Sequence, residues 1–333
     1  MARQGTLEKA RGKPSLARAP KFPALVCVAA ILLICAYSAF AIHRLIASNA
    51  PPSVTFTLGT AYRDVAYCNS QTLDVFVPAK AATRPLPLAI FVHGGGLTGG
   101  DKGYLKPTFL SALAGAGFAV ASLNYRLAAG SLNYRLAPSS QSLAPSNKFP
   151  AQIEDVKCGI RYLRAHAQRY GIDPGKFFAF GTSYGGTLAV LAALTGGHSK
   201  FDVGPCANTS SAIKAAVDMF GPADLPGWIS PQSFHIAFGG NRPNLVLASP
   251  VHYVKADAPP ILIVQGTADT KVPASQSAEL YRKLGASGDQ TQLLLVQHMG
   301  HMFAQVGSQP INPSLTQIAA DMVSWFQQHG AGA

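Results

Sequence analysis

One serine in the sequence stands in a setting that can make its hydroxyl group a nucleophile. Ser183 is the central residue of Gly-Thr-Ser-Tyr-Gly at positions 181–185, a match to the pattern G-x-S-x-G. An apolar run at 177–180 predicts a strand before the motif, and residues 186–194 predict a helix after it. Small residues at both ends of the motif allow a sharp turn that holds the serine hydroxyl above the sheet. This context favours a nucleophile over an ordinary turn.

A nucleophilic serine needs a general base and a carboxylate that orients this base. Both residue types follow Ser183 in the chain. Asp269 comes just after a strand predicted at 261–264, and His301 comes after the next predicted strand, at 293–296. We predict that Ser183, Asp269 and His301 form a catalytic triad, in which the histidine takes the serine proton and the carboxylate orients the histidine.

Other residues compete for the roles of base and acid. His298 is nearer to the strand end, but the pattern Gly-His-x-Phe at 300–303 and the reach needed over the sheet favour His301. Asp224 precedes a proline-rich stretch rather than following a core strand, so Asp269 is favoured. The alternative interpretation of Asp269 is a residue that caps a helix or stabilises a turn.

A glycine-rich loop follows the strand predicted at 88–92 and reads His-Gly-Gly-Gly-Leu-Thr-Gly at 93–99. Glycines let backbone N–H groups approach a developing negative charge, as in an oxyanion hole. The loop also matches G-x-G-x-x-G, but no helix begins there and no acidic residue follows about 20 positions later to hold a ribose. A flexible turn is the remaining alternative.

Together these motifs resemble those of the α/β-hydrolase superfamily, in particular its HGGG-bearing esterases related to hormone-sensitive lipase and to bacterial acetyl and feruloyl esterases. The resemblance covers about residues 60–330. Its segments are HGGG (93–96), NYRLA (124–128), FPAQIEDV (149–156), GTSYGG (181–186), GPADL (221–225), PPILIVQGTADTKVP (259–273) and GHMF (300–303). It implies an α/β fold with a mostly parallel central sheet flanked by helices on both faces, and the chain order nucleophile, acid, histidine.

The resemblance also implies an oxyanion hole made by the backbone N–H groups of Gly95, Gly96 and Tyr184. Many such esterases have an aromatic residue where this chain has Leu97, which we expect to shape the acyl pocket. The expected reaction is hydrolysis of short-chain or carbohydrate-linked acyl esters through an acyl-enzyme. No Cys-x-x-Cys or His-Glu-x-x-His pattern occurs, so a metal site has no support, and no cofactor is expected.

Two other functions stay open. A serine peptidase of the prolyl-oligopeptidase type shares the triad order, but such enzymes usually carry a propeller domain and no blade-length repeat is found. A catalytically inactive hydrolase fold used as a binding module is the second alternative. The intact serine, aspartate and histidine in the expected order argue against it.

The elements that must position these residues alternate between strand and helix, which predicts a mostly parallel sheet covered on both faces. Residues 62–67 and 72–77 predict an antiparallel edge hairpin, after a further β-rich run at 54–58. Residues 151–170 predict a helix with one apolar stripe. Buried parallel strands are predicted at 88–92, 118–123, 177–180, 213–217, 261–264 and 293–296.

A stretch rich in proline and aromatic residues, at about 225–258, is expected to form a cap over the site. Trp228, Phe234 and Phe238 are candidate walls of the acyl pocket. Ordinary core aromatics beneath a loop are an equally good interpretation of these three residues.

The N-terminus predicts export of the catalytic domain. Residues 1–23 form a basic head, residues 24–42 are apolar and uncharged, and residues 43–59 form a linker. Nineteen apolar residues are about enough to cross a bilayer as a helix, and positive charge before the span keeps the head in the cytoplasm. A cleaved signal peptide is the alternative. The formal net charge is +12, but outside the head the basic residues are scattered, which argues against a nucleic-acid partner.

Two further features concern the chain after the apolar span. Cys68, Cys158 and Cys206 allow one disulfide and one spare thiol, and the sequence leaves the pairing open. The segment SLNYRLA at 122–128 recurs at 131–137. We expect the first copy to continue a strand and the second to lie in the following loop, as a local duplication that the fold tolerates.

Overall fold

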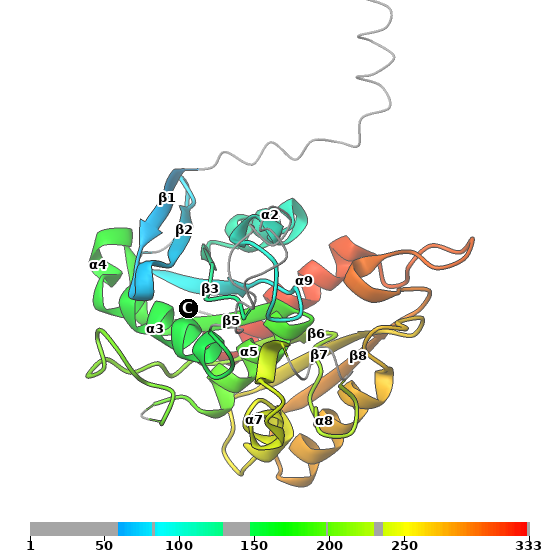
Figure 1. Ribbon diagram of the computed structural model, residues 1–333. Coiled ribbons are helices and arrows are strands. Elements are labelled where there is room, and N and C mark those ends of the chain that lie inside the picture. Colours follow the sequence, from blue (N-terminus) through cyan, green and yellow to red (C-terminus); the bar gives the residue numbers. More distant parts are fainter. Residues whose placement is uncertain (1–58, 82–83, 129–146, 198, 230–235, 332–333) are drawn as a thin grey trace, which may run out of the picture. The chain divides into compact units, whose positions relative to one another are not determined.

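The computed structural model describes residues 59–81, 84–128, 147–197, 199–229 and 236–331 (Figure 1). The predicted head and apolar span, the second copy of the repeat and Phe234 lie outside these ranges. None of the helices within the ranges is long and apolar enough to cross a membrane.

Eight strands form one sheet in the order β1-β2-β4-β3-β5-β6-β7-β8. The first three strands in this order pair antiparallel, and all pairs from β4 to β8 are parallel. The predicted mostly parallel sheet is therefore confirmed. The strands are β1 (Thr60–Ala66), β2 (Thr72–Val77), β3 (Leu86–Val92), β4 (Ala119–Leu123), β5 (Ile172–Thr182), β6 (Ala216–Met219), β7 (Ile261–Gly266) and β8 (Thr291–Val296).

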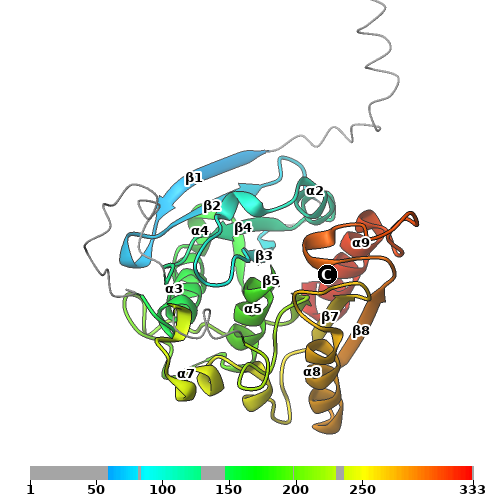
Figure 2. The ribbon, with the colours of Figure 1, turned by 45° about the vertical axis from the view of Figure 1, so that its right-hand side comes forward.

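Helices cover both faces of this sheet (Figures 1 and 2). The core beneath α3, α5 and α8 is separate from the core beneath α2 and α9. The helices are α2 (Pro107–Gly115), α3 (Ala151–Ala165), α4 (Ala167–Tyr170), α5 (Tyr184–Leu194), α7 (Arg242–Leu247), α8 (Ala274–Ala286) and α9 (Leu315–Phe326). Short helical turns are η1 (Cys68–Ser70), η2 (Lys102–Tyr104), η4 (Pro250–His252), η5 (His301–Phe303) and η6 (Gln327–Ala331).

Strand β3 shows why the central strands read as continuous apolar runs. Leu88 and Ile90 point into the core on one face, while Ala89 and Phe91 point into the core on the other. All four side chains are buried. Since helices cover both faces of the sheet, side chains on both faces of such a strand are buried and therefore apolar. Each fully buried Leu, Ile or Phe stabilises the fold by about 1.5–3 kcal/mol.

Two predicted elements differ from the structure. The strand predicted at 213–217 begins later, because Ala216 is the first residue of this segment that pairs with both neighbouring strands. The helix predicted at 151–170 is two helices, since the backbone leaves the helical region at His166, with φ −108° and ψ 20°. The apolar stripe continues across the break and hides it from a sequence pattern.

The first copy of the repeat belongs to the sheet only at Ser122 and Leu123, and the chain leaves β4 after them. Gln152 on α3 holds the chain on both sides of the second copy. Its Nε2 donates hydrogen bonds to the carbonyl oxygens of Arg126 at 3.0 Å and of Asn147 at 2.6 Å. The position predicted for the second copy stays a prediction.

A disulfide joins Cys68 of η1 to Cys158 of α3, and Cys206 is free. The bridge fastens the hairpin of β1 and β2 to the helix that follows the repeat. It settles the pairing that the sequence left open.

Candidate active site

The strand-to-helix turn at Ser183 is strained in the way that its motif predicts. β5 ends at Thr182, α5 begins at Tyr184, and Ser183 between them has φ 53° and ψ −131°. A Cβ atom on Gly181 would lie 2.2 Å from the carbonyl oxygen of Gly185, so a larger residue would clash there. Ser183 is 7% exposed at the carboxyl end of β5. A non-glycine residue at positive φ persists only where the surroundings hold it, which is common at nucleophiles.

The three residues predicted to cooperate are brought together by the structure. Nε2 of His301 lies 3.0 Å from Oγ of Ser183, and Nδ1 of His301 lies 2.8 Å from Oδ2 of Asp269. Asp269 follows β7, and His301 begins η5 after β8. Because β5, β7 and β8 run parallel, their carboxyl ends lie at the same edge of the sheet. Side chains far apart in the sequence therefore converge.

Asp269 is held as an anion by the groups around it. Its Oδ1 accepts the backbone N–H groups of Lys271 at 2.8 Å and of Val272 at 3.0 Å. Burial alone would raise the pKa of Asp269, but hydrogen bonds from His301, Val272 and Lys271 outweigh it and lower the pKa below its ordinary value. An ionised carboxylate favours the proton on Nδ1 of His301, which leaves Nε2 free to accept the serine proton.

Neither rival residue belongs to this cluster. His298 is exposed, and its ring makes no hydrogen bond to any residue that the structure describes. Its backbone carbonyl accepts the N–H of Val306 at 2.8 Å. Asp224 donates its backbone N–H to Oε1 of Gln276 at 2.7 Å, and within the described ranges its carboxylate forms no hydrogen bond or ion pair with a histidine. The structure thus places Asp269 and His301, and not their rivals, beside the serine.

The glycine-rich loop after β3 passes directly beside the serine. A Cβ atom on Gly94 would lie 3.2 Å from Cβ of Ser183. Gly95 and Gly96 have φ values of 119° and 66°, and the carbonyl of Gly95 accepts the N–H of Gly99 at 3.0 Å. Toward the described part of the chain, the N–H groups of Gly95 and Gly96 make no hydrogen bond. Uncommitted N–H groups near a nucleophile are suitable donors to an oxyanion.

His93, at the start of this loop, has a structural role that could not be predicted from the motif alone. Its Nδ1 lies 2.7 Å from the carbonyl oxygen of Gly94, and its ring stacks on Tyr125 at 4.2 Å. The hydroxyl of Tyr125 donates to the carbonyl of His93 at 2.8 Å. Burial lowers the pKa of His93, so the ring stays neutral in this stack. The tyrosine of the NYRLA segment therefore braces the glycine-rich loop, a role predictable only from the pairing of β3 with β4.

Two residues of β6 and its following loop lie beneath the serine turn and were also missed. Asp218 is buried, its Oδ1 accepts the N–H of Gly221 at 2.9 Å, and a Cβ atom on Gly186 would lie 2.1 Å from that oxygen. Burial raises the pKa of Asp218 to about 8, although the bond from Gly221 opposes the shift. Phe220 packs edge-on against the ring of His301 at 5.0 Å. The two residues support the turn and the histidine from below.

The predicted pocket residues are placed differently from one another. Leu97 is 1% exposed in the core, and Phe238 is fully buried, as expected of a core aromatic. Trp228 is only partly buried, and its ring centroid lies 6.4 Å from that of Tyr184. Phe234 lies outside the described residues. Contact with substrate stays a prediction for all four.

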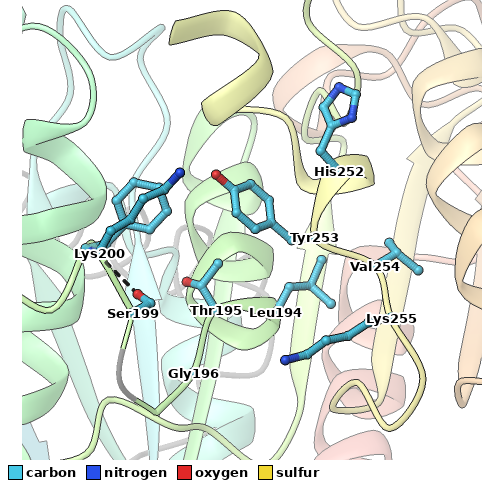
Figure 3. A pocket seen from close by; sticks show the side chains of 10 residues that line it. Leu194, Thr195, Gly196, Ser199, Lys200, His252, Tyr253, Val254 and Lys255 are labelled. Atoms are coloured by element: carbon cyan, nitrogen blue, oxygen red, sulfur yellow. Dashed lines mark hydrogen bonds between the residues drawn. The ribbon is translucent and has the colours of Figure 1, made fainter. Parts of the chain in front are cut away.

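A cavity of about 360 Å³ lies at the other end of α5, where Thr195, Ser199 and Tyr253 line it (Figure 3). The eleven residues of α5 separate it from the serine by about 16 Å. Below it, buried Lys157 donates to Oγ1 of Thr195 at 3.2 Å and to Oγ of Ser199 at 2.7 Å, and pairs with Asp202 at 2.8 Å. Within the described ranges, no group of three or more His, Cys, Asp or Glu side chains is placed to hold a metal.

Comparison with known proteins agrees with this arrangement. The model of the BD-FAE family matches residues 73–284. Esterase LipC of Mycobacterium tuberculosis is 28% identical over 262 residues, which are 75% of this chain and 61% of LipC. The probable carboxylic ester hydrolase LipM of the same organism is 29% identical over 237 residues, which are 65% of this chain and 51% of LipM. The chain thus spans about half to three fifths of the length of these curated relatives.

A solved structure is similar over almost its whole length. A truncated carbohydrate esterase from gut microbiota superimposes with a TM-score of 0.66 at 27% sequence identity. The alignment covers 83% of this chain and 98% of that one.

Proposed function

Since the chain belongs to the BD-FAE family of α/β-hydrolase esterases, we propose that it is a serine carboxylic-ester hydrolase. The observation that carries this proposal is the line of hydrogen bonds from Asp269 through His301 to Ser183, at a strained turn beside the glycine-rich loop. We expect the substrates to be short-chain or carbohydrate-linked acyl esters.

In the proposed acylation step, Oγ of Ser183 attacks the ester carbonyl while Nε2 of His301 takes its proton. Asp269 holds the imidazole in the required tautomer and stabilises the imidazolium that forms. His301 then gives the proton to the leaving alcohol, and an ester between Ser183 and the acyl group remains. In the second step His301 activates a water molecule, which releases the acid and restores the serine.

The oxyanion formed in both steps is expected to accept hydrogen bonds from the backbone N–H groups of Gly95, Gly96 and Tyr184. Tyr184 is the first residue of α5, where N–H groups have no partner within the helix. Loss of one such donor typically costs a factor of about 10² to 10³ in rate. Because these donors are backbone groups, side-chain substitutions leave them in place.

The carbohydrate part of the proposal rests on the similarity to the carbohydrate esterase from gut microbiota. We further propose that residues 225–258 cap the site. The described part of this segment packs on the same core as Tyr184 through Leu225, Phe238 and Leu245, which supports a position near the serine.

The test uses the purified protein with p-nitrophenyl acetate, acetylated xylan and a prolyl p-nitroanilide. We expect hydrolysis of the first two, none of the anilide, and a loss of about 10⁴-fold or more in Ser183→Ala without a change in melting temperature. Hydrolysis of the anilide alone would support the peptidase alternative. A fully active Ser183→Ala variant would overturn the proposal.

The basic head and apolar span also support a proposal on location: an N-terminal membrane helix with an exported catalytic domain. A disulfide between Cys68 and Cys158 fits an oxidising compartment. Protease added to intact spheroplasts should degrade the catalytic domain. Protection of the domain would contradict export, and its release into the soluble periplasmic fraction would favour signal cleavage over anchoring.

A further inference from the structure

The side chain of Tyr184 has a feature that its proposed backbone role does not require. Tyr184 is 6% exposed, and its hydroxyl group has no hydrogen-bond partner in the described part of the chain. The other buried tyrosines differ: Tyr125 donates to the carbonyl of His93, whereas the hydroxyl of Tyr170, like that of Tyr184, is buried without a hydrogen-bond partner in the described ranges and lies on α4, away from Ser183. A buried hydroxyl group without a partner is unfavourable, and phenylalanine would fill the same space without this penalty.

The location of this hydroxyl group distinguishes it from other buried polar groups. Tyr184 directly follows the proposed nucleophile. Thr182, which precedes the nucleophile, also has an unpartnered hydroxyl group, but a Cβ atom on Gly94 would lie 3.4 Å from it, so the glycine-rich loop covers it. The long side chain of Tyr184 instead extends to two aromatic residues of the proposed cap. Its ring centroid lies 6.4 Å from Trp228 and 6.5 Å from Phe238.

The surroundings keep this hydroxyl group a neutral donor. Burial raises the pKa of Tyr184 well above its ordinary value, so the phenol retains its proton at the pH where esterases work. Trp228, which neighbours the ring of Tyr184, is partly exposed. An apolar wall with one fixed donor is the usual design of a ligand pocket in which the polar group sets specificity.

Resting on the proposed esterase function, we propose that the hydroxyl group of Tyr184 is a specificity determinant that donates a hydrogen bond to an oxygen atom of the bound ester. The preferred ester then carries a hydroxyl or ether oxygen on the group that packs against Tyr184 and Trp228. That oxygen belongs either to the sugar alcohol or to a hydroxylated acyl chain. A purely hydrocarbon group in this place leaves the hydroxyl group unpaired and is selected against.

The test compares matched ester pairs in the wild type and in Tyr184→Phe, which retains the ring and the backbone N–H. For the alcohol side, the pair is a monoacetylated methyl xyloside and cyclohexyl acetate. For the acyl side, it is p-nitrophenyl 3-hydroxybutyrate and p-nitrophenyl butyrate. We expect kcat/KM of Tyr184→Phe to fall about 10- to 100-fold for the oxygen-bearing member of one pair and to stay constant for its hydrocarbon partner. The affected pair identifies which side of the ester Tyr184 contacts.

Tyr125→Phe is the matched control, because it removes a hydroxyl group that braces the glycine-rich loop. Any effect of this control should be equal for both members of a pair. Equal losses for both members in Tyr184→Phe, or no change in either pair, would overturn the inference and leave the esterase function intact. A wild-type protein that hydrolyses no ester would overturn the proposed function itself, together with the role of Tyr184.

Discussion

The two ends of helix α5 differ in how their polar groups are paired. Ser183 lies at the N-terminal end, and a buried network around Lys157 lies at the C-terminal end. At the N-terminal end the backbone of Ser183 is strained, with φ 53°. The hydroxyl groups of Thr182 and Tyr184 beside it have no hydrogen-bond partner in the described ranges. At the C-terminal end Thr195 has an unstrained backbone conformation, with a negative φ of −111°. Lys157 donates to Thr195 and pairs with Asp202.

The difference is the one expected if the residues around Ser183 act on a substrate, as proposed above, and those around Lys157 hold the fold. Strain and unpaired polar groups reduce stability, so they persist where another requirement selects them. In the network at the C-terminal end, Lys157, Thr195 and Asp202 are all hydrogen-bonded, although Nε of Arg161 beside them has no partner in the described ranges. Thr195 and Ser199 of this network line the cavity of Figure 3. We therefore place the proposed chemistry at the strained serine and its histidine rather than at this cavity.

The largest effect is expected from a variant that removes the proposed base, His301, near the N-terminal end of α5. His301→Ala should lower kcat/KM for p-nitrophenyl acetate by about 10⁴-fold or more, because the serine loses its proton acceptor. Its melting temperature should stay close to that of the wild type. His298→Ala is the matched control, since its ring is exposed and lies outside the cluster. Loss of activity in the His298 variant instead would show that the base is wrongly assigned.

The next largest effect should be a loss of stability in a variant of Lys157, near the C-terminal end of α5. Lys157→Met leaves the buried carbonyl of Thr195 without its donor and removes one of the two cations that pair with Asp202, the other being Arg161. We expect the free energy of unfolding to fall by about 3 kcal/mol. Urea denaturation measures this value. The rate of ester hydrolysis should not change. Lys255→Met, at an exposed residue lining the same cavity, should change stability by less than about 0.5 kcal/mol.

An effect that is smaller per pH unit, but accumulates as the pH changes, is expected beneath the serine turn. The pKa of Asp218 is about 8 in the folded protein and 3.8 ordinarily. Between these values the folded state holds a proton that the unfolded chain releases, so this group makes stability fall as the pH rises from about 4 to 8. Its slope is at most about 1.4 kcal/mol per pH unit.

Asp218→Asn mimics the neutral acid and does not titrate. We expect its stability relative to the wild type to grow between pH 5 and pH 8, as measured by urea denaturation across the range. A constant difference over this range would show that Asp218 is ionised in the folded protein.

The smallest expected effect is that of deleting residues 129–137, which restores a single copy of the repeat. Gln152 holds the chain on both sides of the deletion, and halving a loop changes its closure free energy by only about 0.6 kcal/mol. The variant should be soluble and hydrolyse p-nitrophenyl acetate at a rate close to that of the wild type. An insoluble product would show that the second copy is structural.

What the sequence could predict were features with a local pattern. The strand at 72–77 has the predicted bounds, because alternating apolar residues are visible in six positions. The strained turn at Ser183 was predictable for the same reason, since its glycines and flanking elements are near neighbours in the sequence. Asp269 and His301 needed only chain order and the expectation that parallel strands end at one edge.

The remaining features depend on contacts between distant segments. Asp218 looks like one polar residue in an apolar run, and only the fold shows that Gly221 and Gly186 enclose its carboxylate. The disulfide joins residues 90 positions apart, so its pairing depends on how η1 meets α3. The unpaired hydroxyl of Tyr184 is likewise a property of its three-dimensional surroundings, since any tyrosine in a sequence could have found a partner.

The Cys68–Cys158 disulfide also bears on how this protein can evolve. The duplicated stretch lies between the two cysteines, and the bridge holds α3 against the hairpin of β1 and β2 whatever the length of the chain between them. We therefore expect that slippage during gene replication can add or remove a nine-residue copy without displacing either cysteine. If the deletion variant folds as predicted, a lineage with this covalent tether can inherit such changes, and natural selection can act on the duplicated stretch alone.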